Sequence, residues 1–357
     1  MRKTIKDMAE YLLNLLPPEI PATFEIDEMF HDILHEEAIR DGICAFKDFL
    51  CRFYGSLIAK GNSFDKPKKE AHPFADGINI STSYPFICNL AVILLNIGSH
   101  GILSKSGDSI ILDDIQLLTA KNNISNLKIP DSRIMDCLRF LEDCGIRIGG
   151  IDLNEKKPNF ISLGFLEVSY PENPIMLTGL KVMAIAQRDL ITKTIQDVLL
   201  RCDYRVLAKK ETDIFMLLND LVYHLPADVR EFVIKLHQDY MKYGYKVEYS
   251  TTSFYMRFTY FCRSKELWRL NSSLNNGFSI GIKALNTDKY ADIIKDFPEW
   301  LQSKIAKGYG CGKTLGTSTS CDGGCRGFRV PLDDSFMETS EVTKKWINAE
   351  VSLTQKK

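Results

Sequence analysis

Beyond Gly244, apolar side chains recur at every second residue, and this alternation limits the fold more than any other feature of the chain. A period of two is typical of β-strands, because successive side chains point to opposite faces of the sheet. Strand-like runs occupy residues 245–249, 254–260, 267–270 and 278–285. The dipeptide Asn276-Gly277, just before the last run, is a signal for a tight hairpin turn. The sequence therefore predicts four antiparallel strands.

Helices are predicted on both sides of these strands in the chain. Apolar residues spaced three and four apart predict helices over 212–223, 228–243, 288–294, 299–307 and 341–351. We expect the two helices within 288–307 to cover one face of the sheet. Residues 328–330 are predicted to add an edge strand. The C-terminal half is therefore predicted to belong to the α+β class.

The sequence LPADVR at 225–230 opens the second of these helices, which leads into the predicted sheet. In this layout, residues 212–332 resemble small uncharacterised bacterial domains with a curved antiparallel sheet. The resemblance covers the layout and this one stretch. It implies an α+β fold and carries no assigned activity.

The rest of the chain is predicted to be mainly helical. Apolar spacing predicts helices over 5–16 and 27–60, and the polar residues 61–73 are a predicted linker or exposed loop. We predict a helical N-terminal region over 1–80, a middle domain over 81–172, a connecting helix over 173–211, and a C-terminal domain over 212–357 with a Cys-rich loop at 308–331.

The middle region has the element order of a winged helix. Helices are predicted over 85–97, 113–121 and 130–145, followed by strand-like runs at 146–153 and 160–168. The candidate recognition helix carries Arg133 and Arg139 together with four acidic residues. A DNA-reading surface needs donors for phosphates and base edges. We therefore interpret this region as a protein-contact or structural module, with a DNA-binding regulator as the alternative.

Composition excludes a strong general attraction to nucleic acid or to acidic membranes. The 45 basic and 46 acidic residues leave a formal net charge of -1. The longest apolar run, 90–95, is far shorter than the roughly 20 residues that span a bilayer. The N-terminal stretch is predicted to be an amphipathic helix that ends at Pro17 and Pro18, and not a signal peptide. We expect a cytoplasmic protein whose partner is a protein or a small molecule.

Three of the ten cysteines, Cys311, Cys321 and Cys325, lie close together in a glycine-rich segment. Thiolates are suitable ligands for zinc, and glycines allow a backbone to wrap closely around a metal. A closed zinc site needs four ligands, and Cys262 on the second predicted strand is our candidate for the fourth. These residues predict a binding or regulatory protein with a structural metal and no assigned catalytic residue. Unligated surface thiols are a further interpretation.

Cationic residues around the same cysteines support a different hypothesis. Lys307, Lys313, Arg326 and Arg329 lie nearby in sequence, and nearby cations favour the reactive thiolate. A thiol redox enzyme or sensor is therefore the alternative function. The cysteines lack an adjacent His that would act as a base, so a Cys-His hydrolase is not expected.

Two further groups of residues are candidate binding sites. Tyr255 and Arg257 lie on the strand face opposite to the core-facing set, so this face is either covered by helices or lines a pocket. With Arg326 they form our predicted ligand-binding set. His31 and His35 stand four residues apart, as two metal ligands on one helix face would. Because a third ligand is not evident, a solvated helix face is the preferred interpretation of this pair.

Overall fold

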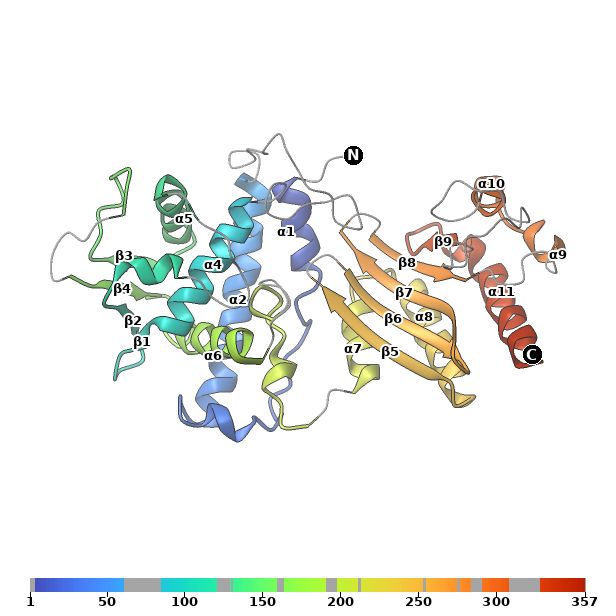
Figure 1. Ribbon diagram of the computed structural model, residues 1–357, viewed down its shortest axis with the longest axis horizontal. Coiled ribbons are helices and arrows are strands. Elements are labelled where there is room, and N and C mark those ends of the chain that lie inside the picture. The colour runs from blue at the N-terminus through green and yellow to red at the C-terminus, as the bar shows by residue number, and fades with distance from the viewer. Residues whose placement is uncertain are drawn as a thin grey trace. The chain divides into compact units, whose positions relative to one another are not determined.

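The computed structural model describes residues 4–60, 85–120, 129, 131–158, 164–190, 198–210, 213–252, 255–274, 277–283, 291–307 and 328–356. Within these ranges the protein combines helices with two antiparallel sheets, and so has an α+β fold (Figure 1). The chain forms two compact units, Met1–Thr212 and Asp213–Lys357. None of the helices in the described ranges has the length and apolar character that a membrane span requires. The boundaries between the four predicted regions stay predictions.

The N-terminal unit contains a helix crossing with glycines at the contact. α2 (Glu36–Lys60) packs against α6 (Met176–Leu190), which also packs against α4 (Pro85–His100). A methyl group on Gly179 would lie 2.0 Å from the backbone oxygen of Gly42, and one on Gly42 would lie 2.7 Å from the Gly179 nitrogen. Both distances are far below van der Waals contact, so only glycine allows these two backbones to approach so closely.

The first helix begins at a well-formed N-terminal cap. α1 (Ile5–Leu13) lies within the predicted 5–16 range and packs against α2. The Thr4 hydroxyl accepts a hydrogen bond from the Asp7 nitrogen at 3.2 Å, and the Asp7 carboxylate accepts one from the Thr4 nitrogen at 2.7 Å. This reciprocal pair satisfies backbone donors that have no partner inside the helix.

The segment before α2 is not the continuous helix that we predicted over 27–60. It contains the 3-10 turn η1 (Glu28–Phe30), and α2 begins only at Glu36. The Asp27 nitrogen donates to the Leu207 oxygen at 2.8 Å, and the Asp27 carboxylate accepts from the Met29 nitrogen at 3.0 Å. This long-range pairing holds the backbone extended at Asp27, so the helix prediction is wrong for 27–35.

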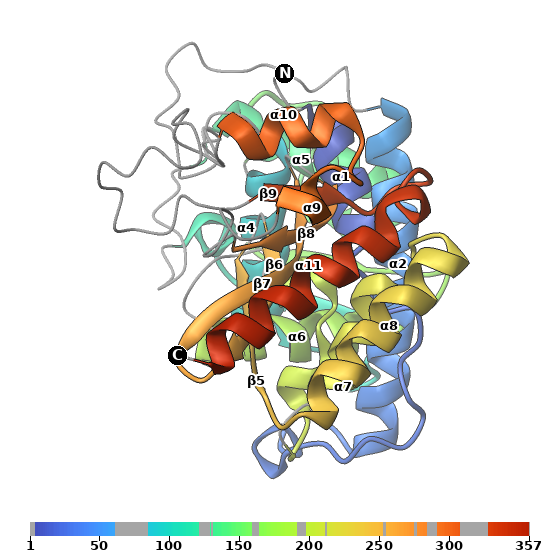
Figure 2. The same cartoon turned by 90° about the vertical axis from the view of Figure 1, so that its right-hand side faces the viewer.

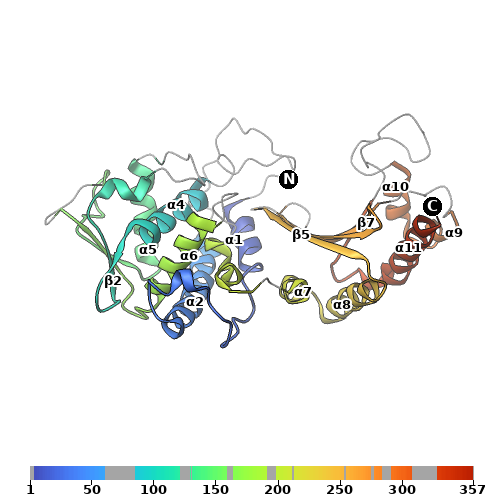
Figure 3. The same cartoon turned by 60° about the horizontal axis from the view of Figure 1, so that its bottom comes forward.

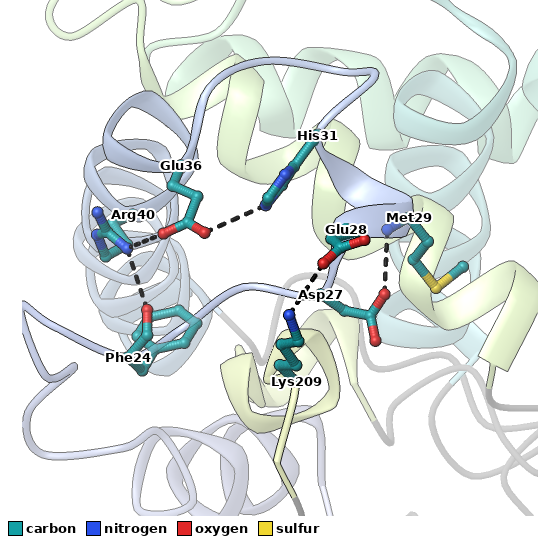
Figure 4. Close-up of polar contacts among 8 residues, drawn as sticks. All are labelled: Phe24, Asp27, Glu28, Met29, His31, Glu36, Arg40 and Lys209. Carbon is teal, nitrogen blue, oxygen red and sulfur yellow. Dashed lines mark hydrogen bonds and ion pairs between the residues drawn. The ribbon is translucent and has the colours of Figure 1, made fainter.

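His31 and His35 therefore do not lie four apart on one helix face, and that prediction is also wrong. His31 precedes α2, and its Nε2 is 3.2 Å from Glu36 Oε1 (Figure 4). On the other side of the segment, Lys209 Nζ is 2.9 Å from Glu28 Oε1. Exposed ion pairs such as these contribute little individually, but they link the segment to α2 and to the end of the unit.

The middle of this unit contains a four-stranded sheet. The chain after α4 forms, in order, β1 (Ile102–Leu103), β2 (Ser109–Leu112), the 3-10 helix η3 (Ile115–Thr119), helix α5 (Asp131–Asp143), β3 (Arg147–Gly149) and β4 (Leu166–Ser169). The strand order is β1-β2-β4-β3 with antiparallel neighbours. β3 is shorter than the predicted 146–153, because Gly150 has a positive φ of 86°. A methyl group there would lie 2.1 Å from the Phe165 oxygen, so only glycine fits at this turn.

The predicted connecting helix is helical in its first part and then changes to short turns. η4 (Leu199–Arg201) and η5 (Tyr204–Leu207) are 3-10 helices. Cys202, between them, has a left-handed backbone with φ of 48°, which ends helical winding at this point. The Gln187 side chain of α6 accepts hydrogen bonds from the backbone nitrogens of Val198 and Leu199 at 2.8 and 3.0 Å.

The C-terminal unit contains the predicted sheet. Its strands are β5 (Lys246–Thr252), β6 (Tyr255–Cys262), β7 (Lys265–Ser273), β8 (Gly277–Ile282) and β9 (Phe328–Pro331). They pair in this order, each antiparallel to the next. The four strands predicted from the two-residue period and the predicted edge strand are thus confirmed.

Helices cover the face of this sheet that carries its largest buried side chains. α7 (Ile214–Val222) leads into α8 (Ala227–Lys242), which lies on the same side of the sheet as α11 (Met337–Gln355) (Figures 2 and 3). Tyr240 of α8 packs edge-on against Tyr260 and Trp268, with ring centroids 5.3 and 5.6 Å apart. α11 contacts β6 and β7.

The helices predicted within 288–307 lie elsewhere. α9 (Ala291–Ile294) contacts α11, and α10 (Glu299–Lys307) contacts the edge strand β9. α11 is longer than the predicted 341–351 and buries Trp346 completely. The covering role that we predicted for residues 288–307 is therefore taken by α8 and α11.

Candidate functional site

Most of the predicted metal site lies outside the described residues. This applies to Cys311, Cys321 and Cys325, and also to Arg326 of the predicted ligand-binding set. Cys262 is described. It ends β6 and is 1% exposed. In the ranges that the structure describes, no group of three or more His, Cys, Asp or Glu side chains is placed to hold a metal ion.

The described cysteines are poor candidates for reactive thiols. Burial raises the pKa of the Cys262 thiol, and it raises the pKa of Cys144 to about 11. The two exposed cysteines of α2, Cys44 and Cys51, also have raised pKa values, chiefly because of partial burial. A raised pKa disfavours the thiolate, which is the nucleophile and the metal ligand. The redox hypothesis therefore depends on the cysteines at 311–325.

The other two predicted ligand residues lie on a polar face of the C-terminal sheet. We call the side opposite to α8 and α11 the outer face. One row of cross-strand neighbours on this face is Arg257, Asn271, Ser279 and Pro331, and the next row is Thr259, Arg269, Gly281 and Arg329. Directly opposite residues in a sheet have Cβ atoms about 5 Å apart, so these two rows bring three guanidinium groups together.

Arg257 is held by contacts on two sides. Its Nε donates a hydrogen bond to Asn271 Oδ1 at 3.2 Å, and its guanidinium carbon lies 4.7 Å from the centre of the Tyr255 ring. Burial, and then the neighbouring Arg269 and Arg329 guanidiniums, lower the pKa of Arg257 from its usual value. Arginine stays charged at any physiological pH, so the lowered pKa indicates a charged group that is partly buried and, to a smaller extent, close to like charges.

Gly281 lies at the centre of this cationic group. Its cross-strand neighbours are Arg269 on β7 and Arg329 on β9, and Ser279 and Lys283 lie two residues away on either side. A methyl group on Gly281 would lie 3.2 Å from Arg269 Nε and Cγ and 3.3 Å from Nδ2 of Asn271. The Arg269 and Asn271 side chains thus lie over the space that glycine leaves open.

Two neutral donors in this group are buried and lack a partner. Asn271 is 5% exposed and Ser279 is 2% exposed. Within the described part of the chain, neither Asn271 Nδ2 nor Ser279 Oγ makes a hydrogen bond. Leaving such a group buried without a partner costs about 1–3 kcal/mol, so native proteins rarely do so without a reason. An ordered water, an ion or a bound ligand can each supply the missing partner.

A carboxylate lies beside the cations. Glu266 lies 3.8 Å from Arg269 Nη1 and 3.9 Å from Lys283 Nζ, both longer than ordinary hydrogen bonds. Together with Arg257 and Arg329, these five described side chains carry a formal charge of +3. A second carboxylate, Glu248 at the β5 end of the same face, is paired with Lys246. Side chains arranged in this way present donors and positive charge, and are suited to an anion.

Two residues of the outer face were predicted from the sequence, whereas the residues around Gly281 were not. We selected Tyr255 and Arg257 because they alternate with core residues on β6, and the structure places them beside each other. The same alternation on the next strands identifies Arg269 and Asn271 beside Trp268 and Leu270. Neutral Ser279 and Gly281 gave no chemical signal, because their importance comes from their neighbours across the sheet.

Comparison of the chain with models of protein families, with curated proteins and with solved structures finds no match.

Proposed function

We propose that this protein is a binding protein, and that its C-terminal unit holds a small anionic ligand on the outer face of the sheet around Gly281. The observation that carries the proposal is the pair of buried donors without partners, Asn271 Nδ2 and Ser279 Oγ, within a group of arginines. An acceptor-only anion satisfies both donors and offsets the repulsion among the guanidiniums.

The burial of the central groups limits the size of the ligand. Thr259, Asn271, Ser273 and Ser279 of the outer face are all at most 9% exposed. A polymer such as single-stranded nucleic acid needs a continuous accessible surface along which its backbone and bases lie. Small anions or small anionic head groups are therefore the favoured class of ligand.

Isothermal titration calorimetry with pyrophosphate tests this function. We expect binding by the intact protein, and a loss of at least about tenfold in affinity for Arg257→Met, which removes one charged donor. Arg230→Met is the matched control, because Arg230 belongs to α8 on the opposite side of the sheet and hydrogen-bonds the Tyr223 oxygen. Equal affinity in the two variants would refute the location of the site.

The structural zinc site remains part of our proposal for the C-terminal unit. It joins Cys311, Cys321 and Cys325 with Cys262, and is supported by the clustering of the first three cysteines in sequence. Metal analysis of purified protein should give zinc in the intact chain and a strong loss in the variant with Cys321→Ser and Cys325→Ser. Negligible zinc in both would exclude the site and favour the redox or the unligated alternative.

A second candidate function concerns the middle of the N-terminal unit. We propose that residues 81–172 form a winged-helix-like module that contacts a protein. The proposal is supported by the order α4, β2, η3, α5, β3, β4 and by the central position of β4 between β2 and β3.

The arginines of α5 favour a protein over DNA as the partner of this module. Arg133 lies 3.4 Å from Asp136. Arg139 lies 3.3 Å from the same carboxylate and donates to the backbone oxygens of Leu153 and Glu155 at 2.6 and 2.8 Å. Guanidiniums bonded in this way are poorly placed to contact phosphates. A gel-shift experiment with mixed duplex DNA at low salt should show no retention, and clear retention would favour the DNA-binding alternative.

A further inference from the structure

The donors around Gly281 also limit the chemistry of the anion. This inference rests on the proposed function and specifies its ligand. Besides the guanidinium groups, the face offers the Asn271 amide and the Ser279 hydroxyl, and the Tyr255 ring lies against Arg257. These groups come from β6, β7 and β8, so they approach a common ligand from several directions in the plane of the sheet.

A carboxylate is a poor match for this arrangement. It is planar, has two oxygens and carries one charge, which suits a single guanidinium in a two-bond contact. Here burial lowers the pKa of Arg257 most, and Arg269 and Arg329 lie close enough to lower it further. A tetrahedral phosphate group with two charges offers three free oxygens and offsets more of the repulsion. Glu266 already supplies one carboxylate at the margin, at distances too long for hydrogen bonds.

The ends of the face differ in a way that indicates where the rest of the ligand lies. Tyr255, Ser273 and Gly277 form the row next to Arg257, and Gly277 is exposed. A methyl group on Gly277 would meet nothing within 4 Å, so space is open beside Gly277 in the row of Tyr255, and a tyrosine ring contacts a flat group favourably. At the opposite end of the outer face from Tyr255, Glu266 and Lys283 lie 3.9 Å apart as a pair of opposite charges.

We infer that the outer face binds a phosphate monoester as its dianion, with the phosphate against the Arg269 and Asn271 side chains that lie over Gly281 and the organic group toward Tyr255. The second ionisation of a phosphate monoester has a pKa of about 6, whereas the arginines keep their charge at all pH values concerned. Affinity should therefore fall when the pH is lowered through 6, because the ligand loses one of its two charges. Sulfate keeps both charges and shows no such change.

Calorimetry with phenyl phosphate and benzoate tests the inference, because the two ligands share the ring and differ in the anion. At pH 8 we expect phenyl phosphate to bind at least about tenfold more tightly than benzoate, and to lose most of that advantage at pH 5. Sulfate, titrated at the same two pH values, should bind equally at both. Equal affinity for phenyl phosphate and benzoate at pH 8 would overturn the inference and leave the anion-binding function standing.

Two variants locate the contact. Arg269→Gln keeps a donor but loses the charge, so the preference for phenyl phosphate over benzoate should decrease. Gly281→Ala places a methyl group 3.2 Å from Arg269 and 3.3 Å from Asn271, and should weaken phenyl phosphate binding through the space it fills. If both variants fold, as circular dichroism checks, and bind phenyl phosphate like the intact protein, the phosphate does not lie against the Arg269 and Asn271 side chains. Absence of binding by phenyl phosphate, benzoate and sulfate alike would instead refute the proposed function itself.

Discussion

Replacing Ser279 by alanine should stabilise the ligand-free protein while weakening its binding of anions. Ser279 is 2% exposed, and within the described residues its hydroxyl has no hydrogen-bond partner. Burying a hydroxyl without a partner costs about 1–3 kcal/mol, and alanine removes that cost while keeping Cβ. Taking the lower end gives a gain of about 1 kcal/mol for Ser279→Ala, or a rise in melting temperature of about 4 °C for a unit of this size.

The loss of binding should be larger than the gain in stability. A hydrogen bond to a charged group contributes about 1.5–3 kcal/mol, so Ser279→Ala should weaken phenyl phosphate binding by about 10- to 100-fold. Thermal unfolding without phosphate or sulfate in the buffer measures the first effect, and calorimetry measures the second.

Ser352→Ala provides the matched control for Ser279→Ala. Ser352 is exposed on α11, on the opposite side of the sheet from the outer face, so its replacement should leave the affinity unchanged and the melting temperature nearly unchanged. A Ser279→Ala variant whose ligand-free form melts several degrees below the intact protein would contradict this prediction. That result would mean that the hydroxyl already has a partner, such as a buried water, and does not await a ligand.

Three further predictions concern other parts of the chain. Gly179→Ala should destabilise the N-terminal unit by about 3 kcal/mol or more, because the added methyl group would lie 2.0 Å from the Gly42 oxygen. Gly55→Ala is the control: Gly55 lies on α2 with no atom near the added methyl group, so this variant should be neutral or more stable by up to about 1 kcal/mol. Urea unfolding of the two variants measures both changes in the free energy of unfolding. His237 is buried against Tyr260, with its Nδ1 2.9 Å from the hydroxyl, and burial lowers its pKa from the usual 6.5. Its imidazole is neutral in the folded and the unfolded state above pH 6.5, so stability is unaffected there. Below pH 6.5 the unfolded state takes up the proton first, so the C-terminal unit should lose stability as the pH falls, and His237→Gln should reduce this slope in melts between pH 7.5 and 5. His224 has a lowered pKa for the same reason and should keep part of the slope in that variant. Lys181→Met should lower the melting temperature of the N-terminal unit, because Lys181 Nζ on α6 donates a hydrogen bond to the Gly101 oxygen, just beyond the end of α4, at 2.7 Å. A melting temperature equal to that of the intact protein would show that water replaces the amine.

The sheet of the C-terminal unit was predictable because its signal is local. Alternation along each strand fixes which residues share a face, and the dipeptide Asn276-Gly277 is a sequence signal for a turn between β7 and β8, so β5 to β8 were predictable from the sequence. The same alternation placed Tyr255 and Arg257 together on the outer face.

The centre of the site was not predictable, because it depends on pairing between distant segments. Arg329 reaches Gly281 only through the pairing of β9 with β8, and no local pattern reveals which strand β9 joins. The failure at 27–35 has the same origin. Apolar spacing there favours a helix, but the hydrogen bond from Asp27 to Leu207 holds the backbone extended, and this contact spans most of the unit.

The edge position of β9 has a consequence for how the site is assembled. Four residue pairs, from Ile282 with Phe328 to Ser279 with Pro331, connect β9 to β8. The other strands of the sheet, β5 to β8, follow one another directly in the chain. Arg329 joins the remaining donors only once that attachment is made, so a bound anion and the docked strand strengthen each other by mass action. Exchange of the amide hydrogens of residues 328–330 should accordingly slow when the ligand is present, so the last strand of the chain reports whether the site is occupied.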